Sequence, residues 1–374
     1  MATQISRRQM LKMALGIGGG FVAGSVLVAC GAPATTTAPG AGASTTAVPA
    51  TTAAPAATAG TAAAAMTAAD VALTDAEIIK IKDMKLRIGF NTNHRTDDFI
   101  NTLIKGGETT ANDYGIELLV GEANFDANKQ LADIEALVQQ KVNAIFMVAV
   151  DGDSISPAIQ KANAANIPVI VVGGAPSRGT VLSVLNATAY DGCRESATFL
   201  MKQLNNTGKV GVITIPLALD TIKERDRGTT DGITQNGGQI VSTQATFKQD
   251  EALSLTQNII QSTPDLAGIF ATWSLAVNGA LAAIEASGKT IPMAGFDAEV
   301  AGFQAFDKKN PNLYALSGQQ AILQGKAGLD ALCKSLLGQP VASSLLVPNM
   351  LVTRDNYKEM WDTLYPGAKA PWMA

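Results

Sequence analysis

Two hydrophobic patterns alternate along the chain from Leu86 onward. Short apolar runs, typical of strands covered on both faces, precede longer segments whose apolar residues recur every three to four positions, as in amphipathic helices. The runs predict strands at residues 86–90, 116–120, 144–150, 168–172, 210–215, 240–247, 268–271 and 292–296. The longer segments predict helices at residues 99–114, 127–140, 156–165, 224–236, 252–262 and 276–287. This alternation predicts an α/β fold with parallel sheets and right-handed crossovers.

The strand–helix–strand unit occurs in similar form in both halves of the series. The separation between Phe146 and Pro168 in the first half equals that between Phe270 and Pro292 in the second. The repetition favours two lobes of one fold, with a single large sheet as the alternative.

The N-terminal segment, residues 1–29, has the pattern of an export signal. Arg7 and Arg8 precede an apolar, glycine-rich stretch at residues 13–29, which is short for a membrane span. The paired arginines resemble the twin-arginine signal. Leu27-Val28-Ala29-Cys30 resembles a lipobox, and this resemblance implies a mature N-terminus at a lipidated Cys30. The alternatives are an uncleaved signal anchor and a Cys30 that is only a small apolar residue.

The segment that follows Cys30 has almost no large apolar side chains to bury. Residues 31–69 are nearly all Ala, Thr, Pro and Gly, and the first charge comes at Asp70. Such a composition cannot offset the entropy of ordering. We therefore assign residues 1–29 to a signal peptide and residues 30–84 to the lipidated cysteine and a flexible tether. In this arrangement only the lipid anchor holds the protein on the membrane.

Composition excludes several function classes for the remaining body. In the whole chain, 28 Lys and Arg residues nearly balance 32 Asp and Glu residues, and the basic residues do not cluster, so no nucleic-acid interface is indicated. His94 is the single histidine. Metal sites with several histidine ligands and nucleophile–base pairs that use histidine are therefore not indicated. We expect no catalytic residue, no metal and no cofactor. A glycosidase using Asp97 and Asp297 is the enzyme that remains as an alternative. Cys193 and Cys333 are expected to be buried helix residues in different lobes.

Three motifs in the second half carry a family resemblance: Arg225 to Gly228, Gly295-Phe296-Asp297, and Gln319 six residues before Gly325. With the order of elements, they resemble the ribose- and galactose-type periplasmic binding proteins, the type I solute-binding proteins of ABC importers. The resemblance implies two Rossmann-like lobes joined by a three-segment hinge. The first lobe would comprise positions 85–188 and 320–347, and the second would comprise positions 189–319 and 348–374.

The resemblance also implies a function. A monomeric protein outside the cytoplasm would bind a small polar ligand, in most members a monosaccharide, by closing its hinge. It would then deliver the ligand to an ABC permease powered by a separate ATPase. A sensor that reports a sugar or furanone to a membrane receptor is the alternative on the same fold.

The candidate ligand-binding residues follow strands, because ligands of doubly wound sheets lie at the carboxyl ends of the strands. Asn and Asp side chains exchange hydrogen bonds with hydroxyls, and aromatic rings pack on the apolar face of a sugar. The residues after the first strand are candidates on this ground, and those of the second lobe match family positions or end strands. The full set is Asn91, Asn93, Asp97, Phe99, Arg225, Phe247, Trp273, Asp297 and Gln319.

Alternatives remain for several of these residues. Asp97 and Asp297 could be helix caps, Arg227 could replace Arg225, and Trp273 could belong to the core. The chain also has Gly173-Gly174, Ala149-Val150 and Trp273 where the ribose branch of the family has polar residues. These departures leave the ligand open among pentoses, hexoses, polyols and furanones.

Overall fold

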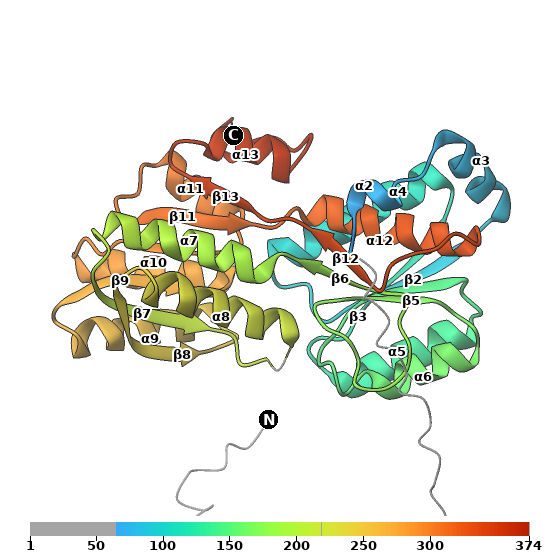
Figure 1. Ribbon diagram of the computed structural model, residues 1–374, viewed down its shortest axis with the longest axis horizontal. Coiled ribbons are helices and arrows are strands. Elements are labelled where there is room, and N and C mark those ends of the chain that lie inside the picture. Colours follow the sequence, from blue (N-terminus) through green and yellow to red (C-terminus); the bar gives the residue numbers. More distant parts are fainter. Residues whose placement is uncertain (1–64, 218, 374) are drawn as a thin grey trace, which may run out of the picture. The chain divides into compact units, whose positions relative to one another are not determined.

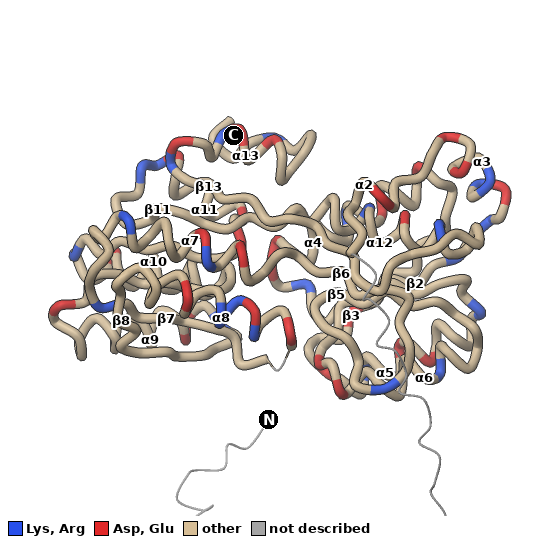
Figure 2. Tube along the Cα trace, in the orientation of Figure 1, with Lys and Arg blue, Asp and Glu red and all other residues tan. Residues whose placement is uncertain are grey.

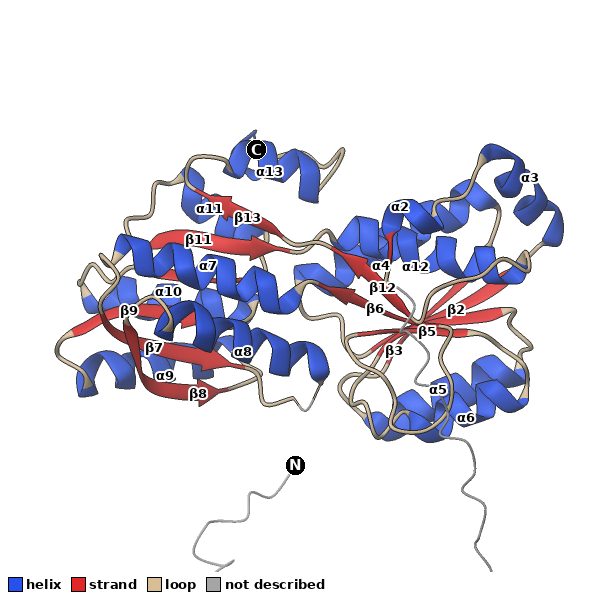
Figure 3. Cartoon of the chain, in the orientation of Figure 1, coloured by secondary structure: helices blue, strands red, loops and turns tan. Residues whose placement is uncertain are grey.

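Two parallel sheets, each covered by helices on both faces, form the folded body (Figure 1, Figure 3). The computed structural model describes residues 65–217 and 219–373. The first sheet has the strand order β1-β12-β6-β5-β4-β2-β3 and is wholly parallel. Its strands are β1 (Met66–Thr67), β2 (Arg87–Thr92), β3 (Glu117–Glu122), β4 (Ala144–Val148), β5 (Val169–Val172), β6 (Ser183–Ala187) and β12 (Ser344–Val347).

The second sheet has the order β13-β11-β10-β9-β7-β8, and its edge strand β13 runs antiparallel to β11. Its strands are β7 (Gly208–Thr214), β8 (Gly238–Ala245), β9 (Leu266–Ala271), β10 (Met293–Phe296), β11 (Leu313–Gly318) and β13 (Met350–Thr353). The two-sheet α/β architecture predicted from the sequence is confirmed, and the single large sheet is excluded.

Helices of both lobes are amphipathic or apolar and lie against the sheets. Those of the first lobe are α2 (Ala68–Val71), α3 (Asp75–Met84), α4 (Asp98–Tyr114), α5 (Ala127–Gln139), α6 (Ser156–Ala164) and α12 (Ala321–Leu336). Those of the second are α7 (Ala189–Gln203), α8 (Asp220–Thr234), α9 (Gln249–Ser262), α10 (Ser274–Ser287), α11 (Val300–Asp307) and α13 (Tyr357–Leu364), with a 3-10 turn at Pro371–Met373.

The core follows from the alternation of side chains along strands that are apolar on both faces. In β4, Ile145 and Met147 belong to the apolar cluster formed with α5 and α6, whereas Phe146 and Val148 belong to the cluster formed with α4 and α12. In the second lobe, α7 and α8 cover one face of the sheet, and α9 and α10 pack on the other. This packing on both faces holds the central strands of each sheet in place.

The chain passes between the sheets three times. β6 ends at Ala187 and α7 begins at Ala189, β11 ends at Gly318 and α12 begins at Ala321, and β12 ends at Val347 before β13 begins at Met350. We call residues 66–187 and 321–347 lobe 1, and residues 189–318 and 350–373 lobe 2.

Residues 66–84 differ from the predicted tether, which extended to residue 84. β1 pairs with β12 through Met66 and Leu345, and Ile81 of α3 is fully buried. Glu77 accepts a 3.0 Å hydrogen bond from Lys334 of α12. This segment is therefore part of lobe 1, and the predicted tether boundary is wrong because the folded body already begins at Met66.

The glycines of two sequence motifs are contact points between helices. A Cβ on Gly228 of α8 would lie 2.2 Å from the carbonyl oxygen of Tyr190, and one on Gly325 of α12 would lie 2.3 Å from that of Leu103. Any side chain there would separate α8 from α7 or α12 from α4. Gly228 therefore sets the position of the turn of α8 that carries Arg225.

Cys193 and Cys333 are free, buried and in different lobes, as predicted. Lys and Arg alternate with Asp and Glu over both lobes (Figure 2). Among the described residues, no helix has the length and apolar character needed to span a membrane. The predicted signal peptide, Cys30 and most of the predicted tether lie outside the described residues.

Candidate functional site

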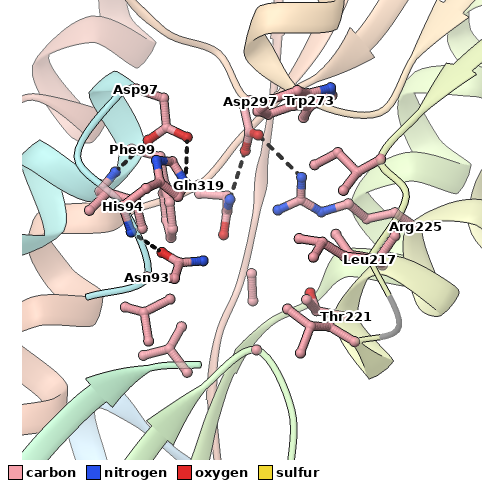
Figure 4. Close-up of a pocket in the computed structure, with 18 of the residues that line it drawn as sticks. Asn93, His94, Asp97, Phe99, Leu217, Thr221, Arg225, Trp273, Asp297 and Gln319 are labelled. Carbon is pink, nitrogen blue, oxygen red and sulfur yellow. Dashed lines mark hydrogen bonds and ion pairs between the residues drawn. The ribbon is translucent and has the colours of Figure 1, made fainter. Parts of the chain in front are cut away.

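A cavity of about 80 Å³ lies at the carboxyl ends of the strands, between lobe 1 and lobe 2 (Figure 4). This is the place at which doubly wound sheets bind ligands. Eight of the nine predicted ligand-binding residues line it: Asn93, Asp97, Phe99, Arg225, Phe247, Trp273, Asp297 and Gln319. At about 10–15 Å³ for each water-sized sphere, the cavity has room for a small molecule only. Contact of these residues with a ligand stays a prediction.

Asp297 is the centre of a buried polar network (Figure 4). Its carboxylate accepts a 3.2 Å hydrogen bond from Nη1 of Arg225 and a 2.7 Å bond from Nε2 of Gln319. Its backbone is left-handed, with φ of 68°, a conformation uncommon outside glycine that recurs at functional sites. The N-cap of α11 is Glu299, so the cap role considered for Asp297 does not apply.

Arg225 is buried and held from several sides. Its Nη1 also donates to the carbonyl oxygen of Thr272 at 2.9 Å, and its guanidinium carbon lies 4.0 Å from the ring centroid of Phe296. Its Nε has no hydrogen-bond partner among the described residues. Arg227, the alternative, is exposed, pairs with Glu224 and does not line the cavity. Of the two arginines, Arg225 can present a buried charge to a ligand.

Asp97 is both a helix cap and a cavity residue. It accepts a 2.9 Å hydrogen bond from the backbone N–H of Ile100, and its other oxygen lies 3.4 Å from Nε2 of His94. Nδ1 of His94 accepts from the N–H of Thr96 at 3.2 Å, so the ring proton belongs on Nε2, facing Asp97. Burial lowers the pKa of His94 to about 4, which leaves the ring neutral. Burial, with the negative charge of Asp297 nearby, raises the pKa of Asp97 to about 7.

The two lobes are joined by hydrogen bonds at both ends of the cavity. Near Asp97, the N–H of Phe99 donates to Glu299 at 3.0 Å, and the N–H of Val300 donates to Asp98 at 3.3 Å. At the other end, the N–H of Thr221 donates to the carbonyl oxygen of Gly173 at 3.2 Å. Burial, with Asp97, Asp297 and Asp98 close by, raises the pKa of Glu299 to about 9. The structure therefore has its lobes closed over the cavity.

Aromatic rings form a further contact between the lobes. The ring of His94 stacks on Phe125 at 4.3 Å, and Phe125 lies 5.7 Å from Phe247 of lobe 2. Phe125 has a left-handed backbone with φ of 59°, which is strained for a bulky residue. Both phenylalanines are more than one-third exposed, so they cover the cavity at the protein surface.

Trp273 lines the cavity and is also part of the core. It is 3% exposed, precedes α10 and belongs to the apolar cluster with Ala276 and Val277. Its indole Nε1 is buried without a partner among the described residues. Trp273 is therefore both a core residue and part of the cavity lining, and its stacking on a ligand stays a prediction.

Asn91 lies outside the cavity lining, in contrast to its predicted place. Its amide donates to Asp133 at 3.0 Å and its oxygen accepts from Gln130 at 2.8 Å. The predicted strand ends at Phe90, but β2 continues to Thr92, so Asn91 is inside the strand. Its amide fastens α5 to β2 and is not available to a ligand.

Several residues of the site were not predicted from the sequence: His94, Phe125, Leu217, Thr221, Glu299 and Gln324. His94 belongs to the polar run after the first strand, which the sequence indicates as a candidate binding segment, but it was not among the residues selected from that run. Glu299 comes two residues after Asp297, and that spacing was the one signal that could have indicated it. Among the described residues, no cluster of three or more His, Cys, Asp or Glu is arranged to hold a metal.

Two kinds of known protein resemble this chain in sequence over most of its length. The ribose import binding protein of Bacillus subtilis is 29% identical over 267 residues, which cover 71% of this chain and 87% of that protein. The xylitol-binding protein of Mycolicibacterium smegmatis is 27% identical over 277 residues, covering 72% of this chain and 78% of that protein. Both are named as binding proteins, not as enzymes.

Solved structures of low sequence identity share the fold. An ABC transporter solute-binding protein from Bacillus halodurans with bound myo-inositol has a TM-score of 0.69 at 24% identity, covering 75% of this chain and 98% of that chain. Another, from Actinobacillus succinogenes with bound D-allose, has a TM-score of 0.68 at 22% identity and covers 74% of this chain and 100% of that chain. The fold is that of type I periplasmic binding proteins.

A sequence model of the periplasmic binding protein domain matches residues 88–340. This range includes every residue that lines the cavity, from Asn93 to Gln324. The chain belongs to the periplasmic binding protein domain family.

Proposed function

We propose that this protein captures a small polyol, of the size of a monosaccharide, outside the cytoplasm and delivers it to an ABC importer. One observation carries the proposal: a small cavity enclosed by both lobes contains the buried network of Arg225, Asp297 and Gln319. Charged groups with spare hydrogen-bonding capacity in a closed site suit a ligand rich in hydroxyls. The names of the ribose and xylitol relatives support the same class of ligand.

Binding in this proposal proceeds by closure of the hinge. The ligand first meets one lobe, and the other then completes its hydrogen bonds. The bonds from Phe99 to Glu299 and from Thr221 to Gly173 form only when the lobes meet, so they stabilise the liganded form. The closed surface is what a permease, powered by a separate ATPase, would recognise.

Anchoring is a second part of the proposal and rests on the N-terminal sequence. Arg7 and Arg8 would direct export, and Cys30 would carry the lipid. Each buried methylene of an acyl chain contributes about 0.8 kcal/mol of membrane affinity, so several chains hold the protein firmly. The uncharged stretch that follows would let the folded body reach a membrane-embedded partner.

Calorimetric titration with pentoses, hexoses and linear and cyclic polyols tests the binding claim, with melting curves alongside. A ligand at 100 times its dissociation constant stabilises the folded protein by about 2.7 kcal/mol. We expect saturable binding of at least one compound at one site per chain. A folded protein that binds none of these compounds contradicts the proposal.

A further inference from the structure

The cavity has two chemically different halves. The polar half contains Asn93, Asp97, Arg225, Asp297 and Gln319, and Figure 4 shows the last four grouped near Phe99 and Trp273. The opposite half is lined by Val148, Val172, Leu185 and Ile215, and Ile222, one helical turn from Arg225, lies where the two halves meet. Thirteen of the 23 lining residues are apolar, so the polar groups serve only part of a ligand's surface.

Strand order explains why the halves are separate. In the first sheet, the polar residues follow β2, whereas the apolar ones end β4 and β5 or lie in β6, further along the sheet. In the second sheet, Asp297 and Gln319 follow the neighbouring strands β10 and β11, and Ile215 follows β7, with β9 between. The apolar residues at the strand ends of both sheets therefore lie on the same side of the cavity.

Few polar side chains are near the apolar half. Asn186 and Thr221 line the cavity but also line a neighbouring surface pocket, which puts them at its rim. Buried apolar residues continue from α6 of lobe 1, through Ile215 and Ile222, to α9 and α10 of lobe 2. A hydroxyl placed in this half would lose its water without gaining a partner, which is unfavourable.

The apolar half is also closed, which limits what can fill it. The bond from Thr221 to Gly173 joins the lobes beside Val172, and Phe125 and Phe247 meet at the surface. With about 80 Å³ in the whole cavity, there is too little room for an extended alkyl or aryl group. A methyl group or a deoxygenated carbon fits this half.

We propose that the ligand is a deoxy- or methyl-bearing polyol, with its hydroxyls at Asp97, Arg225 and Asp297 and its apolar end against Val148, Val172 and Ile215. This inference rests on the proposed function and narrows its ligand class. It predicts discrimination by a single hydroxyl, because the fully hydroxylated analogue must bury that group unpaired.

Matched sugar pairs test the inference directly. D-fucose and D-galactose differ by one hydroxyl, as do L-rhamnose and L-mannose, and 2-deoxy-D-ribose and D-ribose. Calorimetry should show at least about tenfold tighter binding of the deoxy member in the pairs that bind. Equal or tighter binding of the hydroxylated member would overturn the inference and leave the proposed function standing. Absence of binding by all six sugars and by the wider polyol panel would contradict both.

A nearly isosteric variant assigns the preference to the apolar half. Val172→Thr puts a hydroxyl at the end of β5, and the ratio of affinities within a pair should fall by about threefold or more. Val120→Thr on β3, which does not line the cavity, is the matched control and should keep the ratio. Val148→Thr provides a second test should the first variant melt early. An unchanged ratio in folded Val172→Thr and Val148→Thr proteins would overturn the inference.

Discussion

The backbone N–H of Phe99 in lobe 1 donates a 3.0 Å hydrogen bond to Oε1 of Glu299 in lobe 2, 200 residues further along the chain. In the opposite direction, the N–H of Val300 in lobe 2 donates a 3.3 Å hydrogen bond to Oδ2 of Asp98 in lobe 1. At each helix N-terminus one free N–H group is thus satisfied by an acidic side chain of the opposite lobe, which is favourable for both α4 and α11. The pair of bonds requires closed lobes.

Closure at this contact should depend on pH. The pKa of Glu299 is raised to about 9 by burial and by Asp97, Asp297 and Asp98, and water would return it toward 4.5 when the lobes part. His94, neutral through burial, and Arg225 are the basic groups nearby. The closed form therefore holds a proton more tightly, so closure is favoured at low pH and weakens as pH rises toward 9.

We expect the dissociation constant to rise between about pH 5 and pH 9. Glu299→Gln should flatten this profile, because its amide oxygen can still accept from Phe99 but no longer titrates. Asp97, with its pKa raised to about 7, should leave part of the slope. Glu108→Gln, an exposed change on α4, is the control. A profile that is equally steep in wild type and Glu299→Gln would show that this contact does not control closure.

Asp297→Asn should weaken ligand binding by about ten- to a hundredfold, the range of one charge-assisted hydrogen bond. The same change leaves Arg225 without its carboxylate, so the melting temperature should fall by a few degrees. Calorimetry and a melting curve on one sample separate the two effects. Asp265→Asn, which breaks an exposed pair with Lys209, should alter neither quantity. An unchanged dissociation constant would remove Asp297 from the binding site.

Ile81→Ala should destabilise the protein by about 2–4 kcal/mol, because the side chain is fully buried and its loss leaves a cavity. Ile79→Ala on the same helix is the matched control, since that side chain is 61% exposed and should change stability by less than about 0.5 kcal/mol. Denaturant unfolding measures both. Equal effects would mean that α3 does not pack on lobe 1.

Cys30→Ser should release the protein from the membrane fraction, because acylation needs the thiol. Arg7→Lys with Arg8→Lys should instead block export of the precursor. Fractionation followed by detection of the protein distinguishes the two results. Retention of the Cys30→Ser protein in the membrane would contradict lipid anchoring.

Much of the fold was predictable because its central strands are continuous apolar runs. Residues 144–150 and 268–271 predict β4 and β9 to within two residues at either end. The strand β6 was not predicted, since its five residues alternate between buried and half-buried positions and include polar side chains. Helix α3 was missed because Ile78, Ile79 and Ile81 stand among charges next to a low-complexity stretch.

The site was predictable where a residue follows a strand or belongs to a family motif. Asp297 and Gln319 do so, and strand topology alone places them at the cavity. The prediction for Asn91 was wrong because the predicted strand ends two residues early. Phe125 and Glu299 owe their places to a left-handed backbone and to a contact across 200 residues, and neither leaves a local pattern in the sequence.

Tryptophan emission tests the central claim, that a polyol binds in the cavity between the lobes. Trp273 lines that cavity. Trp361 and Trp372, near the C-terminus, do not line the cavity and pack against each other, with 5.8 Å between their ring centroids. Titration with a binding sugar should shift or quench the emission at the calorimetric dissociation constant. Trp273→Phe should keep the heat of binding and lose most of the optical change. An optical change of the same size in Trp273→Phe, or binding with no effect on Trp273, would place the ligand elsewhere and contradict the account.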